Sequence, residues 1–285
     1  MTIKRVGIVG SGIMGSGIAE VAAKAGHEVV LRSRQQATAD RMVTGLEKSL
    51  AKQVERGKLD EAEATATLTR VSATSDLADL KDCDLVIESI VEDLPTKKHL
   101  FNELDRICQD GAILATNTST LPVIDMAMET GRPDRVCGVH FFNPAPAMAL
   151  VEIVRPLTAS DETIAEARAF AEACGKSPVE VKDQAGFIVN ALLFPYLNNA
   201  VRLLEGGVAT KDDIDAAMKG GCGFPMGPLA LLDLVGLDTS LAILDALYNE
   251  FRDPNYAPVP LLRRMVSAET LGRKSGKGFY DYSKK

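Results

Sequence analysis

Among the three histidines of the sequence, His140 stands where a general base would act. It follows a predicted strand over residues 135–139 and precedes the run Phe-Phe-Asn-Pro. Removing hydride from an alcohol carbon requires a base that takes the hydroxyl proton, and imidazole titrates in the suitable range. His27 falls in a turn and His99 on a helix among surface charges. His140 is therefore the candidate base, although a structural histidine at a strand end would look the same.

Three further side chains complete the candidate catalytic set. Glu152 lies in an apolar predicted strand, where a lone buried carboxylate is costly and needs a partner. If this strand pairs with the preceding one, Glu152 becomes the carboxylate that orients His140. Ser119 follows a strand and Asn190 begins a helix, so both are candidates to bond the substrate oxygen. Taken singly, each of these two is more typical of helix capping or solvent contact.

The elements that must position these residues alternate between strands and helices over the first two thirds of the chain. Strands are predicted over residues 4–9, 28–32, 84–88, 112–116, 135–139 and 149–154. This alternation predicts an α/β protein whose residues 1–184 form a Rossmann-like, doubly wound parallel sheet. The stretch 35–67 is predicted to be an inserted helical hairpin, broken near Gly57.

Beyond Gln184-Ala185-Gly186 the strand signal ends, and residues 185–285 are predicted to form an all-α domain for substrate binding and dimerisation. Its helices are expected over residues 187–206, 211–219, 228–235, 238–251 and 260–268. The apolar run Leu229–Leu234 exceeds what one small bundle needs. It favours a homodimer, with a purely intramolecular core as the alternative.

A glycine-rich turn opens the first helix directly after the first strand. Its residues are Gly10, Ser11, Gly12, Ile13, Met14 and Gly15. In such a turn the first glycine allows the tight bend, the second lets the backbone approach a pyrophosphate, and the third lets helix pack on strand. The helix N-terminus then faces the phosphates. A second strand at 28–32 follows, so the context favours a dinucleotide site over a simple glycine-rich turn.

The second strand ends in Leu31-Arg32-Ser33-Arg34, with no carboxylate before Asp40. NAD-binding domains usually carry Asp or Glu here for the ribose 2′-hydroxyl. Two arginines flanking a serine suit a 2′-phosphate instead. We expect NADP(H) to be accepted alongside NAD(H); the alternative is that both arginines simply face water.

Glu92 and Lys97 follow the strand that ends at Glu88. Strand ends on this edge of a doubly wound sheet face the cofactor crevice, so both residues are plausible cofactor contacts. Alone, each is more typical of a solvated surface charge.

The inserted hairpin carries a basic face. Ser49, Lys52 and Arg56 are spaced i, i+3, i+7 and share one side of a helix. This face could hold the phosphates of a coenzyme A nucleotide. The alternative is a solvated charged surface that also includes Glu47 and Glu55.

Composition excludes several classes of protein. A formal net charge of −7 disfavours nucleic acid as a partner, and no apolar run is long enough to cross a membrane. The first ten residues lack the features of a signal peptide. Five scattered cysteines with no C-x-x-C pair indicate neither a zinc site nor a disulfide framework, so we expect free thiols, no metal and a cytoplasmic location.

At this point the sequence resembles the short-chain L-3-hydroxyacyl-CoA dehydrogenase family, in particular its bacterial members that act on 3-hydroxybutyryl-CoA. The resemblance covers almost the whole chain. Its motifs are GSGIMG at 10–15, NTS at 117–119, VHFFNP at 139–144, DQAGFIVN at 183–190, GFPMGP at 223–228 and KSGKGFY at 274–280.

The resemblance implies a role for each matching residue. His140 matches the catalytic base and Glu152 its partner, while Ser119 and Asn190 match the residues that bind the substrate oxygen. The expected cofactor contacts beyond the glycine turn are Arg32, Ser33, Arg34, Glu92, Lys97, Asn117, Ser119, Asn143 and Lys274. The expected coenzyme A contacts are Ser49, Lys52, Arg56 and Ser119. Ser33 departs from the family, which usually has Asp there.

The implied activity is reversible oxidation of a short-chain (3S)-3-hydroxyacyl-CoA, with 3-hydroxybutyryl-CoA and acetoacetyl-CoA as the expected pair, by NAD or NADP. Two alternatives stay open. One is a related dehydrogenase of sugar acids such as L-gulonate, which would not need the basic hairpin. The other is a catalytically silent nucleotide-binding protein, which would not need the four residues Ser119, His140, Glu152 and Asn190 together.

Overall fold

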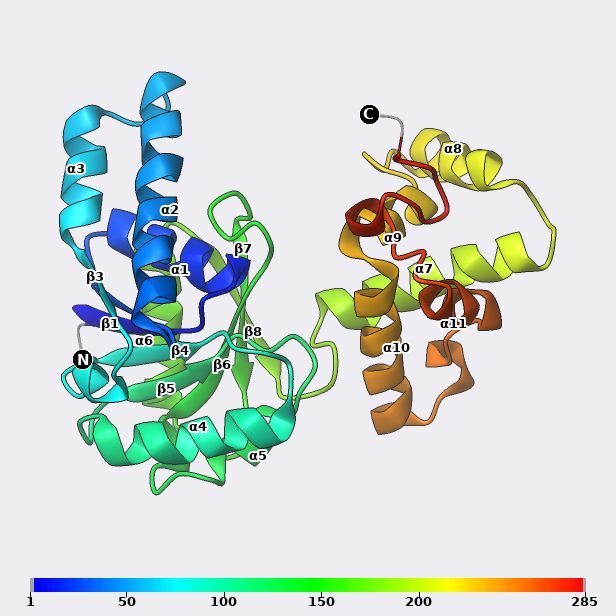
Figure 1. Cartoon of the computed structure of the whole chain (residues 1–285). Coiled ribbons are helices and arrows are strands. Elements are labelled where there is room, and N and C mark those ends of the chain that lie inside the picture. Colours follow the sequence, from blue (N-terminus) through cyan, green and yellow to red (C-terminus); the bar gives the residue numbers. More distant parts are fainter. Residues whose placement is uncertain (1–2, 284–285) are drawn as a thin grey trace. The chain divides into compact units, whose positions relative to one another are not determined.

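The computed structural model describes residues 3–283 and divides the chain into two compact units, Met1–Asp183 and Gln184–Lys285 (Figure 1). None of the helices among residues 3–283 has the length and apolar character that crossing a bilayer requires.

The first unit is built on an eight-stranded sheet of order β3-β2-β1-β4-β5-β6-β7-β8. Its strands are β1 (Arg5–Val9), β2 (Glu28–Arg32), β3 (Val71–Thr74), β4 (Leu85–Glu88), β5 (Ile113–Thr116), β6 (Val136–Phe141), β7 (Leu150–Arg155) and β8 (Ser177–Lys182). All neighbouring strands are parallel except β6 and β7, which are antiparallel. The first six strands have the doubly wound order 3-2-1-4-5-6, so the predicted fold class is confirmed.

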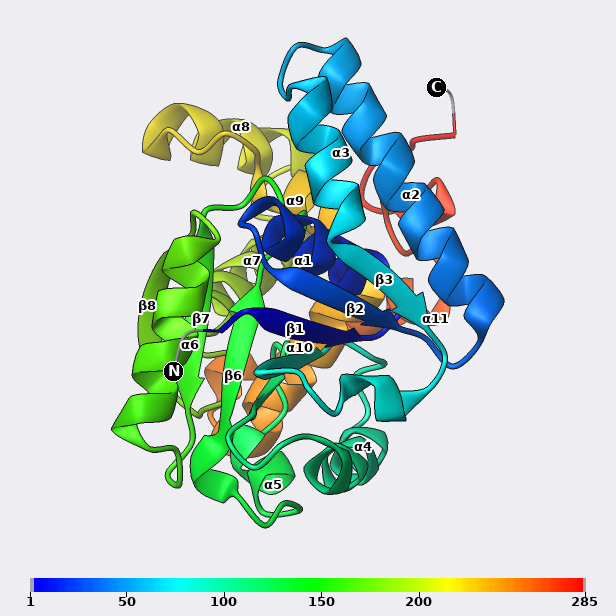
Figure 2. The ribbon, with the colours of Figure 1, turned by 90° about the vertical axis from the view of Figure 1, so that its left-hand side faces the viewer.

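Helices cover both faces of this sheet (Figure 2). They are α1 (Ile13–Lys24), α4 (Leu94–Ile107), α5 (Val123–Ala127) and α6 (Asp161–Ala173). The small side chains of α1, such as Ala19 and Ala22, and the larger ones of α6, such as Phe170, share one core with the strands. α4 and α5 pack against β5 and β6, below the sheet in Figure 2. The strands β1, β4 and β5 are thus buried on both sides, as their continuous apolar runs require.

Two strands were not predicted from the sequence, β3 and β8. Both are edge strands of the sheet, and each is partly exposed along its length. An edge strand packs on fewer neighbours, so its sequence can be polar or contain proline, as Pro178 does in β8. Their short, mixed sequences therefore lacked the apolar run that marked the central strands.

The predicted helical hairpin is present as α2 (Gln36–Glu55) and α3 (Glu61–Thr69). The two helices share a small core of Leu46, Leu50 and Ala64. Gly57 lies between them with φ of +64°, a left-handed conformation that favours glycine. In Figure 1 the hairpin projects upward from the sheet.

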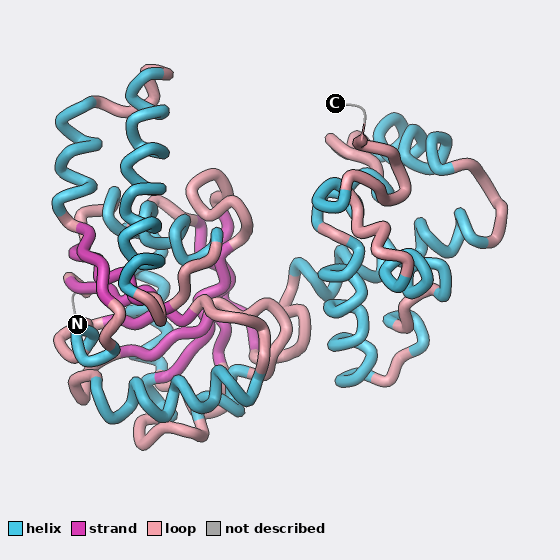
Figure 3. The backbone as a smooth tube through the Cα atoms, in the orientation of Figure 1, coloured by secondary structure: helices cyan, strands magenta, loops and turns pink. Residues whose placement is uncertain are grey.

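The second unit is helical, and the described residues after β8 contain no strand apart from two isolated bridges (Figure 3). Its helices are α7 (Val189–Glu205), α8 (Lys211–Cys222), α9 (Pro228–Val235), α10 (Leu237–Phe251) and α11 (Pro260–Ser267). They surround a core that includes Leu197, Leu229 and Leu244. The run Leu229–Leu234 contributes Leu229 and Leu232 to this core, while Leu234 is 49% exposed.

Candidate functional site

The glycine turn between β1 and α1 has the geometry that its three glycines were expected to provide. A Cβ on Gly10 would lie 2.2 Å from the Ser89 carbonyl oxygen, and one on Gly15 would lie 2.2 Å from the Gly10 carbonyl oxygen. A Cβ on Gly12 would meet nothing within 4 Å. The first and third glycines are thus required by the protein's own packing, whereas the second keeps space open for something outside the protein.

A cavity of about 490 Å³ lies beside this turn. It is lined by residues that follow three strand ends: Gly10, Ser11 and Gly12 after β1, Ser33 and Arg34 after β2, and Ser89, Ile90 and Val91 after β4. β1 lies between β2 and β4, where the strand order reverses, and ligands of doubly wound sheets bind at this reversal. α1 begins at Ile13 with no side-chain cap, so its first amides can serve an anion.

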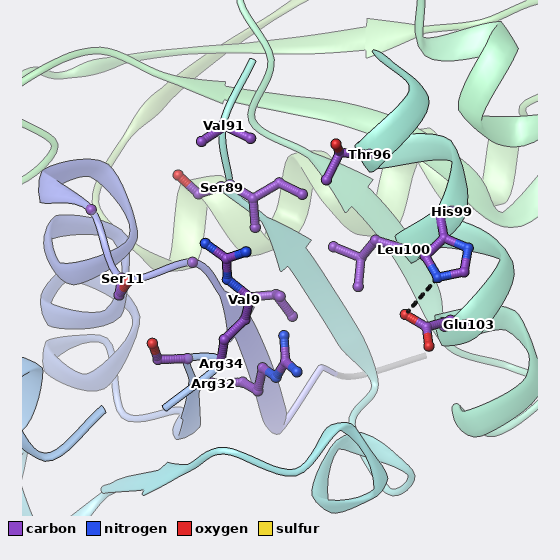
Figure 4. Close-up of a pocket in the computed structure, with 14 residues that line it drawn as sticks. Val9, Ser11, Arg32, Arg34, Ser89, Val91, Thr96, His99, Leu100 and Glu103 are labelled. Carbon is purple, nitrogen blue, oxygen red and sulfur yellow. Dashed lines mark ion pairs between the residues drawn. The ribbon is translucent and has the colours of Figure 1, made fainter. Parts of the chain in front are cut away.

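Both arginines of the Arg32-Ser33-Arg34 segment line this cavity (Figure 4). The Arg32 Nε atom lies 3.4 Å from the Ser75 carbonyl oxygen. Burial lowers the pKa of Arg32, Glu103 opposes that shift, and the nearby positive charge of Arg34 adds to it. Ser33 is only 6% exposed, whereas Arg34 is exposed.

The opposite wall of the cavity is formed by α4, whose residues were not predicted from the sequence to line the cofactor site. It consists of Thr96, His99, Leu100 and Glu103. His99 is exposed, as expected, but it also lines the cavity, and its Nε2 lies 3.7 Å from a Glu103 carboxylate oxygen (Figure 4). Residues one helical turn apart at Thr96, Leu100 and Glu103 share a face, which is the signal that could have found them.

His140 and Glu152 face each other across the antiparallel pair β6 and β7. The His140 Nδ1 atom and the Glu152 Oε2 atom are 2.7 Å apart, and the side chains are 8% and 0% exposed. Phe142 packs on the imidazole at 4.6 Å between ring centroids. A ring held at Nδ1 by a carboxylate is fixed in orientation and presents Nε2 for proton transfer. His27, by contrast, packs against Phe170 and pairs with no carboxylate among the described contacts.

Ser119 and Glu92 are in contact beyond the carboxyl ends of β5 and β4. The Glu92 Oε1 atom accepts a hydrogen bond from the Ser119 amide at 3.1 Å and another from the Thr118 hydroxyl. Glu92 Oε2 lies 3.2 Å from the Lys97 Nζ atom. The three predicted residues Glu92, Lys97 and Ser119 are therefore brought together.

Lys97 is 1% exposed and forms an ion pair with Glu88 at 2.6 Å. The alternative of a solvated surface charge is therefore wrong for Lys97. Glu92, at 38% side-chain exposure, is the member of this group that faces outward.

Asn117 ties the Ser119 turn to the strand that carries His140. Its side-chain oxygen accepts a hydrogen bond of 2.8 Å from the Phe141 amide. Asn143 lies three residues beyond His140 in an exposed loop and precedes Pro144 through a cis peptide bond.

Two predicted site residues belong to the second unit. Asn190 is the second residue of α7. Lys274 lies in a short 3₁₀ turn near the C-terminus, and its Nζ atom donates a hydrogen bond of 2.6 Å to Asp238 at the start of α10.

The expected coenzyme A face on α2 is partly engaged within the protein. The Ser49 hydroxyl donates to a Glu20 carboxylate oxygen at 3.1 Å, so it belongs to a network with α1 rather than to an open surface. Lys52 and Arg56 are exposed. α2 ends at Glu55, so Arg56 caps the helix rather than continuing it.

These features place the chain in the class of NAD-dependent dehydrogenases: a nucleotide cavity at the sheet's reversal point and a histidine held by a buried carboxylate on the same sheet. Comparison with known proteins is more specific. Residues 5–184 match the 3-hydroxyacyl-CoA dehydrogenase NAD binding domain, and residues 186–282 match the 3-hydroxyacyl-CoA dehydrogenase C-terminal domain. The chain belongs to the 3-hydroxyacyl-CoA dehydrogenase family.

Individual relatives match over nearly their full length. The chain is 48% identical to a 3-hydroxybutyryl-CoA dehydrogenase of Clostridioides difficile, over 98% of this chain and 100% of that protein. It is 44% identical to the mitochondrial hydroxyacyl-coenzyme A dehydrogenase of Sus scrofa, over 98% and 91%. The crystal structure of (S)-3-hydroxybutyryl-CoA dehydrogenase from Ralstonia eutropha matches with a TM-score of 0.97 at 44% identity, over 99% and 100% of the two chains.

Proposed function

We propose that this protein catalyses the reversible oxidation of short-chain (3S)-3-hydroxyacyl-CoA to 3-oxoacyl-CoA, with 3-hydroxybutyryl-CoA and acetoacetyl-CoA as its substrate pair. The observation that carries the proposal is the buried His140–Glu152 pair at 2.7 Å. It lies on the same sheet as the glycine turn with its open space at Gly12. The names of the relatives supply the substrate class.

In this proposal each residue has one task. A bound nicotinamide cofactor would supply the hydride acceptor for the C3 carbon, and His140 takes the hydroxyl proton. Glu152 stabilises the positive charge that His140 gains, and its negative charge does so most strongly where water is excluded. Ser119 and Asn190 bond the C3 oxygen, and Asn117, Asn143, Glu92, Lys97 and Lys274 are assigned to the cofactor side.

We further propose that NADP(H) is accepted alongside NAD(H). Arg32 and Arg34 line the cavity, and neither the end of β2 nor the turn after it carries a carboxylate. Guanidinium groups suit a phosphate, and a carboxylate would repel it. Among the residues that line the cavity, Glu103 of α4 carries a carboxylate, and its negative charge partly opposes the binding of a 2′-phosphate.

The remaining assignments complete the proposal. Residues 1–184 serve as the cofactor domain and residues 185–285 as the substrate and dimerisation domain of a homodimer. Lys52 and Arg56 bind the coenzyme A nucleotide, whereas the Ser49 hydroxyl is bonded to Glu20. Five cysteines without a disulfide support a reducing compartment, the cytoplasm.

The test is absorbance at 340 nm with acetoacetyl-CoA, using NADH and NADPH in parallel. Consumption of either cofactor supports the reaction, and the ratio of kcat/KM values tests the arginine argument. A ratio above about 100 in favour of NADH would refute acceptance of NADPH. If neither cofactor is consumed, the acyl-CoA reaction is refuted. The alternatives are then a dehydrogenase of sugar acids and a catalytically silent nucleotide-binding protein.

The matched variant is Ser33→Asp. It restores the carboxylate that usually bonds the ribose 2′-hydroxyl, and it should lower kcat/KM for NADPH while leaving or improving that for NADH. Equal effects on both cofactors would contradict the assignment of this segment to the 2′ position.

A further inference from the structure

Glu88 is a fully buried carboxylate that the proposed reaction does not use. It ends β4 and is 0% exposed. Its Oε1 atom accepts hydrogen bonds of 2.6 Å from the Lys97 Nζ atom and from the Ile90 amide, and its Oε2 accepts one of 2.7 Å from the Thr116 hydroxyl. Burying a carboxylate is costly unless it is paired with a positive charge and hydrogen-bonded. The Glu88 carboxylate therefore depends on its three partners staying in place.

The contacts of Glu88 continue around a closed circuit. Lys97 is shared with Glu92, at 3.2 Å, and Glu92 accepts from the Thr118 hydroxyl and from the Ser119 amide. The Thr118 amide in turn donates to the Thr116 hydroxyl oxygen at 3.1 Å, which returns to Glu88. We call Glu88, Lys97, Glu92, Thr116 and Thr118 the Glu88 network.

This network joins two stretches of the chain, residues 88–97 and residues 116–118. Glu88 ends β4, Lys97 lies in the first turn of α4, Thr116 ends β5, and Thr118 lies two residues beyond that strand. Ser119 is the next residue after this junction, and its amide is bonded to Glu92. The position of the Ser119 hydroxyl therefore depends on where Glu92 is held.

We propose that Glu88 is a positioning residue for the dehydrogenase reaction, acting through Lys97 and Glu92 to fix the Ser119 turn. This inference rests on the proposed function for its catalytic consequence, although the mechanical part stands on the contacts alone. Glu92 is 38% exposed, and a glutamate side chain loses substantial rotamer entropy when fixed. Lys97 and the Thr118 hydroxyl restrict it, and the charge of Glu88 is what keeps Lys97 in place.

The charge balance supports the same assignment. One lysine serves two carboxylates, and it lies closer to Glu88 at 2.6 Å than to Glu92 at 3.2 Å. If Glu88 lost its charge, Lys97 would be drawn toward Glu92, and both would shift relative to the Ser119 amide. A displacement of about 1 Å in a positioning group is enough to change turnover by as much as a hundredfold.

The first experiment measures amide hydrogen exchange by mass spectrometry in the whole protein without substrate. Glu88→Gln keeps the shape of the side chain and one acceptor oxygen but removes the charge opposite Lys97. We expect peptides that cover residues 116–122 to exchange at least about fivefold faster. Unchanged exchange there would overturn the proposal.

The matched control is Asp105→Asn, which breaks a partly buried ion pair at the other end of α4. Asp105 pairs with Arg132 at 2.7 Å and lies eight residues, about 12 Å, along the helix from Lys97. It should leave exchange over residues 116–122 and turnover unchanged. Equal effects of Asp105→Asn and Glu88→Gln would mean general loosening of α4 and would contradict a specific positioning role.

The second experiment measures turnover of acetoacetyl-CoA and includes a second break in the network. Thr118→Val removes the hydroxyl bonded to Glu92, whereas Thr118→Ser keeps it. We expect Glu88→Gln and Thr118→Val each to lower kcat about tenfold, the double variant to lower it little further, and Thr118→Ser to retain most of it. Multiplicative effects in the double variant, or equal losses in Thr118→Ser and Thr118→Val, would refute the network.

Failure of the proposed function is distinguishable from failure of this inference. If the unmodified protein does not consume acetoacetyl-CoA, the reaction is wrong, and the exchange experiment alone decides whether Glu88 holds the Ser119 turn. If Glu88→Gln does not fold, the comparison of Thr118→Val with Thr118→Ser decides through the same peptides.

Discussion

Replacing Glu152 with Gln tests the catalytic pair most directly, because it removes the charge and keeps the shape. Glu152 is 0% exposed and its Oε2 lies 2.7 Å from the His140 Nδ1. A hydrogen bond to a charged group is worth about 1.5–3 kcal/mol. In the reaction this bond strengthens as His140 becomes positively charged, so most of that energy is lost from the transition state.

At about 1.4 kcal/mol per tenfold change, the expected loss in kcat is roughly 10- to 150-fold. The assay is the initial rate of acetoacetyl-CoA reduction at 340 nm, with KM for the cofactor measured in parallel. The KM for the cofactor should change little, because Glu152 holds His140 and is assigned no contact with the cofactor.

The matched control is Glu180→Gln on the neighbouring strand β8. Glu180 pairs with Arg155 at 2.6 Å, but its side chain is 44% exposed, and an exposed pair contributes only about 0–1 kcal/mol. Turnover in this variant should equal that of the unmodified protein. If Glu152→Gln kept kcat within threefold while remaining folded, the role of the carboxylate would be refuted.

Three other perturbations test the packing and charge described above. Gly12→Ala should leave the thermal unfolding midpoint unchanged but raise the KM for the cofactor. Gly15→Ala should lower the free energy of unfolding by about 1–3 kcal/mol, because its Cβ would lie 2.2 Å from a backbone oxygen. Equal stability of the two variants would contradict this contrast. Gly278→Ala should destabilise the second unit by at least about 2 kcal/mol. The new Cβ would lie 1.9 Å from the Asp233 Oδ1 atom, which accepts a hydrogen bond from the Phe279 amide. A denaturant midpoint equal to that of the unmodified protein would contradict this prediction. Burial lowers the pKa of His27 below its usual 6.5, so the contribution of His27 to stability is complete above pH 6.5 and is lost as the pH falls toward the lowered value. In His27→Gln, the free energy of unfolding should therefore decrease less between pH 6.5 and 5 than in the unmodified protein. An unchanged dependence on pH would show that other groups cause the decrease.

The nucleotide site was predictable because its requirements are local. The glycine turn, the strand before it and the helix after it lie within about twenty consecutive residues, and steric demands on each glycine follow from that local geometry. The missing carboxylate after β2 was visible for the same reason. The wall formed by Thr96, His99 and Glu103 was not, because those residues come from a helix whose orientation depends on packing against β5.

The pairing of His140 with Glu152 was intermediate between these cases. Two apolar strands joined by a short loop predict a hairpin, and a buried carboxylate predicts a partner. The register that sets His140 opposite Glu152, rather than one residue away on the other face, required the folded sheet. Ser49 shows the limit of such reasoning, because its spacing on α2 fitted an exposed basic face, yet its hydroxyl is bonded to Glu20 of α1.

The sequence by itself determined the two-part organisation, the class of sheet, the glycine turn and the residues able to carry a dehydrogenase reaction, since each depends on periodicity, spacing or residue type. The edge strands β3 and β8 and the Glu88 network were decided only in the tertiary structure. An edge strand is stabilised mainly by its neighbour rather than by its own composition, and Glu88, Lys97 and Thr118 become partners only when β4, α4 and β5 pack together. These contacts join residues 9 to 28 positions apart and depend on this packing, and no local pattern encodes them.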